Sequence, residues 1–163
     1  MKSCYLCDLR KNKHYVFWEN DLLFAAFDNN PVSPGHTLLV PNRHAIHFDD
    51  LTQQEWNQIQ TSIKVIITNL KKINLKEVYQ RFILEHETDQ SVWFCEKALE
   101  NLQKNSVPDA YNHGFNDGKA AGRTVDHFHW HIIPRYEGDM TDAAGGVRFV
   151  IPEMGDYSVS RNI

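Results

Sequence analysis

The sequence predicts an α+β fold, in which an antiparallel sheet of about five strands has helices packed on one side. Two observations lead to this prediction. Short runs rich in β-branched and aromatic residues occur before residue 42 and after residue 109. Between them lie longer segments whose apolar residues recur at the spacing of a helix. The length of 163 residues is about that of one domain, so we expect a single domain over residues 1–163.

The first two strands are predicted to form a hairpin. Residues 14–20 (HYVFWEN) and 21–28 (DLLFAAFD) are rich in β-branched and aromatic side chains, and turn-like residues separate them. A loop of Asn, Pro, Ser and Gly follows at 29–36. Residues 36–41 (HTLLVP) then predict a third strand, which Pro41 ends.

A capping box predicts the start of the first long helix, because Thr52 is followed three residues later by Glu55. Asn74 with Glu77 predicts the start of a second helix, and a third runs from about residue 91 to residue 102. The apolar residues of the first helix recur on one face: Trp56, Ile59, Ile63, Ile66, Ile67 and Leu70.

Two strands are predicted near the end of the chain. Residues 110–118 (AYNHGFNDG) read as a strand that enters a glycine turn, and residues 127–133 (HFHWHII) as a strand that Pro134 ends. Residues 145–152 (GGVRFVIP) predict a short extended segment.

The strand at 127–133 carries a histidine at every second position. His127, His129 and His131 therefore share one face of the predicted strand, and apolar residues occupy the other, as in a buried sheet. Three interpretations fit: a histidine-rich surface strand, a three-histidine metal site that activates water, and a nucleophilic histidine positioned by two others. Spacing alone does not separate the last two.

The surroundings favour a phosphate-bearing ligand. A glycine-rich turn at 118–122 directly precedes the histidine strand, and such turns offer backbone N–H groups to phosphate. Thr124 adds a hydroxyl, and Arg123 adds a forked cation that suits phosphate geometry. Asp28, His36 and His44 lie upstream.

Composition narrows the class of protein. The net charge of −4 argues against non-specific nucleic-acid binding, which needs a basic surface. Three cysteines are too few for a disulfide framework. No apolar run reaches membrane-spanning length and no signal peptide is evident, so we expect a cytoplasmic protein without a membrane partner.

Four stretches together resemble the histidine triad family of nucleotide hydrolases and transferases. They are FDNNPVSPGHTLLVPNRH (27–44), LTQQEW (51–56), YNHGFNDGKAAG (111–122) and TVDHFHWHIIPRYEGD (124–139). The match covers most of the chain apart from roughly residues 73–106. The tail at 145–152 is similar to that of bacterial members often called diadenosine polyphosphate hydrolases.

The resemblance implies a histidine triad-like fold and a role for each matched residue. His129 matches the nucleophile, and His131 and His36 lie near the phosphates. Asp28 matches the acidic residue that holds the ribose hydroxyls. Polar positions at the phosphate site are matched by Asn116 and Thr124, and the nucleobase pocket by Phe27, Leu22 and Leu38.

The activity implied is cleavage at the α-phosphorus of a nucleoside phosphate derivative, through a covalent nucleotidyl-histidine on His129. The expected substrate is a dinucleoside polyphosphate, the expected assembly is a homodimer, and no catalytic metal is required. Two alternatives stay open: a nucleoside phosphoramidate hydrolase, and a nucleotide-binding regulatory protein with weak turnover.

Two departures from the family pattern matter. Family members usually carry Gln where this chain has Arg123, which keeps the donors, loses the acceptor and adds a fixed charge. An anionic polyphosphate thereby becomes a more attractive substrate. The helical insertion at about 73–106 is either a surface elaboration packed on the main body, or a dimer contact or lid over the pocket.

A zinc site is also implied by the resemblance. Cys4 and Cys7 form a C-x2-C knuckle, which alone is equally typical of two reduced cysteines. Bacterial relatives and the related hexose-phosphate uridylyltransferases pair such a knuckle with a histidine after the third strand and with the first triad histidine. These positions are His44 and His127, so we expect a structural zinc.

Overall fold

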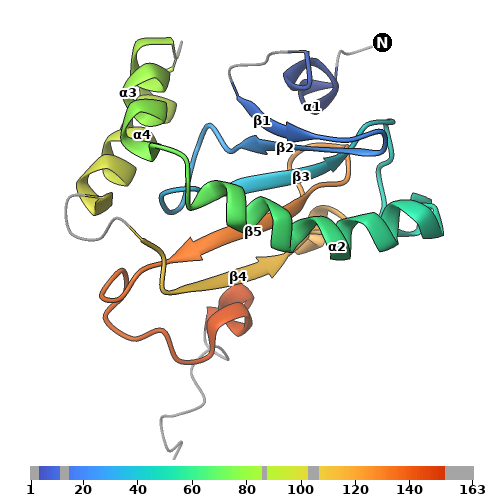
Figure 1. Ribbon diagram of the computed structural model, residues 1–163. Coiled ribbons are helices and arrows are strands. Elements are labelled where there is room, and N and C mark those ends of the chain that lie inside the picture. The colour runs from blue at the N-terminus through green and yellow to red at the C-terminus, as the bar shows by residue number, and fades with distance from the viewer. Residues whose placement is uncertain (1–3, 12–14, 86–87, 103–106, 153–163) are drawn as a thin grey trace, which may run out of the picture.

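The computed structural model describes residues 4–11, 15–85, 88–102 and 107–152, and it contains a single antiparallel sheet of five strands (Figure 1). The order across the sheet is β1-β2-β3-β5-β4. The strands are β1 (Val16–Glu19), β2 (Leu23–Phe27), β3 (Thr37–Pro41), β4 (Ala110–Gly114) and β5 (Trp130–Arg135). The predicted α+β fold is confirmed.

The hairpin of β1 and β2 is closed by Asn20. Its side-chain oxygen accepts from the backbone N–H groups of Leu22 and Leu23, at 2.9 and 2.8 Å. Local polar chemistry of this kind is why the turn could be predicted. The next pairings set the site, because β3 pairs with β5 and places Leu38 opposite His131.

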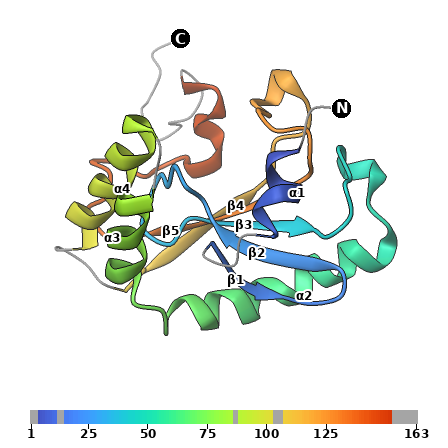
Figure 2. The same cartoon turned by 90° about the horizontal axis from the view of Figure 1, so that it is seen from above.

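The two faces of the sheet have different covers (Figure 2). On one face Leu23, Ala25 and Leu39 pack with residues of α2 (Gln53–Leu70) in the main core. The other face forms a smaller cluster under α1 (Tyr5–Leu9). The sequence did not predict α1, since five residues are too short for a helical period to be recognised. Among the described helices, none is long and apolar enough to cross a membrane.

The long helix α2 begins as predicted. The Thr52 hydroxyl accepts from the Glu55 N–H at 3.2 Å, and the Glu55 carboxylate accepts from the Thr52 N–H at 2.8 Å. Arg43 donates to both carboxylate oxygens of Glu55, at 2.8 and 2.7 Å. The start of α2 is thereby tied to the segment that follows β3.

The insertion forms two helices, α3 (Leu75–Glu85) and α4 (Asp89–Leu102), which lie side by side (Figure 1). This confirms the two helices predicted for the insertion. Tyr79 and Phe82 are fully buried. The Tyr79 hydroxyl accepts from the N–H of Gly35 at 2.7 Å, so α3 supports the loop before His36. The insertion therefore packs against the main body.

Three predicted segments differ from the structure. The strand expected at 110–118 ends at Gly114, and the histidine strand begins only at Trp130. The segment expected to be extended at 145–152 instead contains a 3-10 helix, Gly146–Val150. Its two glycines explain the difference, because Gly145 and Gly146 have φ values of +89° and +47°, which extended strands do not use.

Candidate functional site

A four-donor cluster joins the N-terminus to the sheet. Cys4, Cys7, His44 and His127 offer ligand atoms that all lie within 4.8 Å of one another. The Nδ1 atom of His127 is 3.5 Å from both sulfurs, and that of His44 is 3.5 Å from the Cys7 sulfur. Since Nε2 of His127 donates to the Pro41 carbonyl at 3.0 Å, its Nδ1 lone pair faces the sulfurs.

This geometry fits zinc. A tetrahedral ion bound at the usual Zn–S and Zn–N lengths separates a sulfur from a nitrogen by about 3.5 Å, which is the spacing observed. Two thiolates and two imidazoles form a common structural donor set. The carbonyl of Pro41 supplies the outer contact that fixes the tautomer of His127.

His129 is held in one tautomer. Its Nδ1 lies 2.7 Å from the backbone carbonyl oxygen of His127. A carbonyl can only accept, so Nδ1 carries the proton and Nε2 keeps its lone pair. The side chain is buried, with 8% of the residue exposed. A neutral imidazole with a free Nε2 is a nucleophile that needs no prior deprotonation.

His36, His131 and Asp28 form a chain beside His129. Nε2 of His36 is 3.0 Å from Nδ1 of His131, and Nδ1 of His36 is 3.5 Å from a carboxylate oxygen of Asp28. The rings of His129 and His131 meet edge to face with centroids 4.9 Å apart. The two facing nitrogens of His36 and His131 must share one proton, because two lone pairs would repel.

Burial controls the charge of this group. Burial first, and neighbouring His129 second, lower the pKa of His36 to about 4. The pKa of His131 is also lowered to about 4, by burial first and then by His36 and His129. Burial raises the pKa of Asp28, although the Asn30 N–H and the nearby histidines oppose the shift. Both imidazoles are therefore neutral at pH 7.

The glycine-rich turn presents fewer donors than the sequence suggested. The N–H groups of Ala121, Gly122 and Arg123 donate to backbone carbonyls within the turn. Thr124 is exposed, and its N–H and hydroxyl form no hydrogen bond within the described residues. Asn116 lies against the turn, since a Cβ on Gly122 would be 3.9 Å from its side-chain nitrogen.

The guanidinium of Arg123 is engaged by neighbouring groups, and its assignment to phosphate stays a prediction. Its side chain is 7% exposed and forms ion pairs of 3.2 Å with Asp117 and with Asp126. It also donates to the Ile46 carbonyl at 3.2 Å. His47 joins this network, with Nδ1 2.8 Å from Asp117. Asp117 and Asp126 lie within six residues of Arg123, whereas Ile46 is 77 residues away and no pattern in the sequence links the two.

The proposed nucleobase residues are divided between the two faces. Leu38 lies opposite His131 and packs in the smaller cluster, on the face of the histidines. Phe27 is 2% exposed, with its ring 4.5 Å from that of Phe17 in the core beneath α2. Leu22 packs against that same core. Phe27 is therefore buried in this structure, and its assignment to the nucleobase stays a prediction.

Comparisons with known proteins identify the family of this chain. The HIT domain family matches residues 10–138. An uncharacterized HIT-like protein of Methanocaldococcus jannaschii is 32% identical over 124 residues, covering 76% of this chain and 70% of its own.

The chain is also 28% identical to the asymmetrical bis(5′-nucleosyl)-tetraphosphatase of Schizosaccharomyces pombe, over 78% of this chain and 52% of that protein. A crystal structure of a HIT family protein from Bacillus anthracis aligns with a TM-score of 0.58 and 24% identity, covering 85% of this chain and 77% of that one. That likeness shows a shared fold. Since the family match spans most of the chain, this protein belongs to the HIT domain family.

Proposed function

We propose that the protein hydrolyses a nucleoside phosphate derivative at its α-phosphorus, through a covalent nucleotidyl intermediate on His129. The observation that carries this proposal is the 2.7 Å contact between Nδ1 of His129 and the carbonyl of His127. With Nδ1 as the donor to this carbonyl, the lone pair of the neutral form of this buried ring lies on Nε2. A nucleophile and a fixed acceptor for its other nitrogen are what covalent catalysis by histidine requires.

The reaction would proceed in two displacements. In the first, Nε2 of His129 forms a bond to the α-phosphorus while the bond to the leaving phosphate breaks. In the second, water attacks the phosphorus, the P–N bond breaks, and the nucleoside monophosphate leaves. Nε2 of His36 and Nδ1 of His131 share a proton across 3.0 Å, and the ring of His131 lies beside His129. These two histidines can therefore stabilise negative charge on the phosphoryl oxygens.

The substrate class follows from the neighbours of His129. One carboxylate oxygen of Asp28 accepts from the Asn30 N–H at 2.8 Å, and the other is 3.5 Å from Nδ1 of His36. A carboxylate oxygen can accept more than one hydrogen bond, so Asp28 can also accept from ribose hydroxyls. Thr124 and Asn116, which lie in and beside the turn before β5, are proposed to contact phosphate oxygens. We favour a dinucleoside polyphosphate, supported by the fission yeast relative named for tetraphosphate cleavage. A nucleoside phosphoramidate would use the same displacement.

The Cys4, Cys7, His44 and His127 cluster is proposed to hold a structural zinc. Bound there, the ion would link α1 to the segment preceding β5, and four protein ligands leave no position for water or substrate. His127 would then serve both sites, because its ring faces the sulfurs and its backbone carbonyl accepts a hydrogen bond from Nδ1 of His129.

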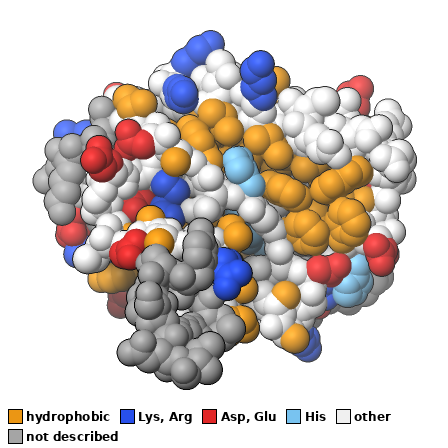
Figure 3. Space-filling model, turned by 90° about the horizontal axis from the view of Figure 1, so that it is seen from below, with side chains coloured by type: hydrophobic (Ala, Val, Ile, Leu, Met, Phe, Trp, Pro, Cys, Tyr) orange, Lys and Arg blue, Asp and Glu red, His pale blue; other side chains and the backbone are white. Residues whose placement is uncertain are grey.

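A homodimer is proposed through the face on which α2 and β4 lie. Figure 3 shows a broad apolar area on this side of the molecule. The chain also has a cluster of partly buried aromatic side chains. In it Phe48 stacks on Phe115, and the ring centroids of Trp56 and Trp130 are 5.9 Å apart. In the described sheet β4 pairs only with β5, so its outer edge has no strand beside it.

Detection of the intermediate tests the proposed function. The protein would be mixed rapidly with diadenosine tetraphosphate, quenched, and analysed by intact and peptide mass spectrometry. We expect one adenylyl group on the peptide that contains His129. Multiple-turnover cleavage separates an enzyme from a regulatory nucleotide-binding protein, and comparison with diadenosine triphosphate and an adenosine phosphoramidate by kcat/KM selects the substrate. Full activity in excess chelator, with zinc still bound, would agree with chemistry that needs no catalytic metal.

A further inference from the structure

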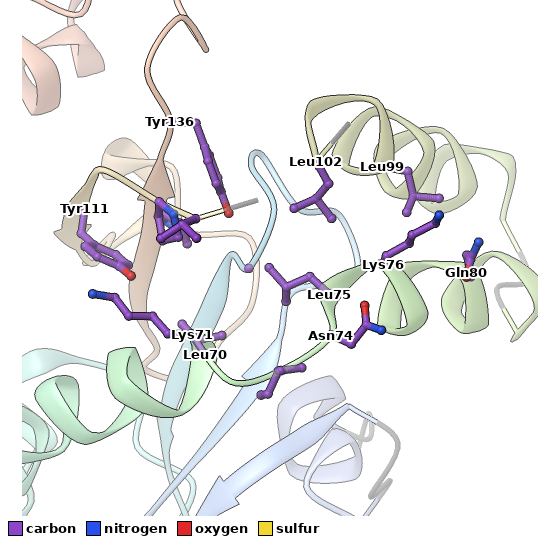
Figure 4. A pocket seen from close by; sticks show the side chains of 15 residues that line it. Leu70, Lys71, Asn74, Leu75, Lys76, Gln80, Leu99, Leu102, Tyr111 and Tyr136 are labelled. Atoms are coloured by element: carbon purple, nitrogen blue, oxygen red, sulfur yellow. The ribbon is translucent and has the colours of Figure 1, made fainter. Parts of the chain in front are cut away.

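A cavity lies beside the loop that carries His36, with Gly35 in its lining. It has a volume of about 450 Å³ and opens between the end of α2, the start of α3, the end of α4 and the strands β4 and β5 (Figure 4). None of the residues that line it belongs to the histidine group or to the four-donor cluster. The insertion at about 73–106 supplies much of its wall.

The walls of this cavity are largely aliphatic. Leu70 and Leu75 form one side, and Leu99 and Leu102 of α4 form another (Figure 4). A pocket of this size with apolar walls and a few polar groups is typical of small-molecule sites. An apolar body is therefore the first requirement for a ligand.

Two lysines and the Tyr111 hydroxyl supply donors to the cavity, beside the amide side chains of Asn74 and Gln80. Lys71 and Lys76 line it with exposed side chains, and neither forms an ion pair within the described residues. The hydroxyl of Tyr111 is buried and has no hydrogen-bond partner there. Figure 4 shows Lys71 and Tyr111 together on one side of the cavity. A buried hydroxyl without a partner costs free energy that a ligand acceptor would recover.

Negative charge is missing from the lining. The fifteen described residues that line the cavity include no Asp or Glu. The neighbouring carboxylate of Asp109 is engaged elsewhere, because it accepts from the Glu137 N–H at 2.8 Å. The lining also lacks Arg, the side chain whose fork best matches phosphate. Single-point donors beside an aliphatic chamber suit a carboxylate better.

We propose that this cavity binds an aliphatic carboxylate, of the chemical class of medium-chain fatty acids. The hydrocarbon chain lies between the leucines of α2, α3 and α4, and the carboxylate accepts from the Tyr111 hydroxyl and pairs with Lys71. The site is separate from the nucleotide site and does not depend on the proposed hydrolysis.

Calorimetric titration of the purified full-length protein with octanoate tests this site. We expect saturable binding of one octanoate per chain, with 1-octanol binding more weakly. Lys71→Gln should weaken octanoate binding about threefold to fivefold, as expected for an exposed ion pair. Tyr111→Phe should weaken it by a similar factor through loss of one hydrogen bond. Lys71→Gln should leave 1-octanol binding unchanged. Tyr111→Phe should reduce 1-octanol binding at most slightly.

Lys72→Gln is the matched control, because Lys72 is an exposed neighbour of the same charge that does not line the cavity. It should bind octanoate as the parent does. Saturating adenosine monophosphate should not displace octanoate, which separates this site from the proposed nucleotide site. The proposal would be overturned by the absence of saturable binding below about 10 mM, or by an equal loss in Lys71→Gln and Lys72→Gln.

Discussion

The carbonyl oxygen of His127 lies 2.7 Å from Nδ1 of His129, and this contact links the four-donor cluster to the proposed nucleophile. The ring of His127 faces the two sulfurs, while its backbone carbonyl accepts the Nδ1–H of His129. One residue therefore contacts both the four-donor cluster and the proposed nucleophile. The predictions below follow from this arrangement and from its surroundings.

Purified protein is expected to contain one zinc per chain, and Cys7→Ser should lose it. Because the ion would tie α1 to the sheet, that variant should also unfold at a lower temperature. Metal analysis after expression with added zinc measures the first effect and calorimetry the second. Cys95→Ala is the control, because Cys95 is a buried core residue on α4. This variant should retain zinc. Less than about 0.2 zinc per chain in the parent would contradict a stoichiometric four-ligand site.

Replacing Asp28 by Ala should mainly weaken nucleotide binding. Its carboxylate can accept from both ribose hydroxyls, and loss of bonds to a charged group typically costs about 1.5–3 kcal/mol. Affinity for adenosine monophosphate should therefore fall by at least about tenfold. Affinity for 2′,3′-dideoxyadenosine monophosphate should be similar in parent and variant. Unchanged binding of adenosine monophosphate would show that Asp28 does not hold the ribose.

Arg123→Gln should affect stability more than substrate binding. Its ion pairs with partly exposed Asp117 and Asp126 predict a loss of about 1 kcal/mol, or roughly 3 °C in Tm. We expect KM for diadenosine tetraphosphate to change by less than about threefold, because a lost phosphate contact would raise it at least about tenfold. Asp117→Asn is the matched variant and should show the same pattern. A large increase in KM for Arg123→Gln alone would assign the guanidinium to phosphate.

Stability should decrease as pH falls from about 6.5 to about 4. The pKa of His36 drops from 6.5 to about 4 through burial, so in this range the unfolded chain binds more protons than the folded one. The free energy of unfolding must then decrease with decreasing pH. Urea unfolding of the parent and of His36→Asn between pH 7.5 and pH 4.5 measures this. The variant should show a shallower slope, and equal slopes would mean that His36 does not contribute.

Local signals explain which elements could be predicted. The capping box of Thr52 and Glu55 and the turn at Asn20 act through neighbours in sequence, so both were identified correctly. The start of α1 carries no such signal. Residues 145–152 were predicted to be extended, which was wrong, because the positive φ values of Gly145 and Gly146 lead into a 3-10 helix.

The site could be predicted less completely than the fold. The ion pairs of Arg123 with Asp117 and Asp126 join residues within six positions, whereas its bond to the Ile46 carbonyl joins a distant segment. Alternation along β2 predicts that Phe27 shares a face with Leu23 and Ala25, and these three residues lie in the core beneath α2. The cavity between α2, α3 and α4 has no linear signature at all.

The most direct measurement is the fate of the covalent intermediate in His129→Ala. Removal of the nucleophile should reduce kcat by several orders of magnitude, each factor of ten being about 1.4 kcal/mol of barrier. The variant should still bind adenosine monophosphate, and no adenylyl group should appear after rapid quenching with diadenosine tetraphosphate. His131→Ala should be slower than the parent yet still form the adduct, and His127→Ala should lose zinc and stability first. An adenylylated protein recovered from His129→Ala would contradict the mechanism.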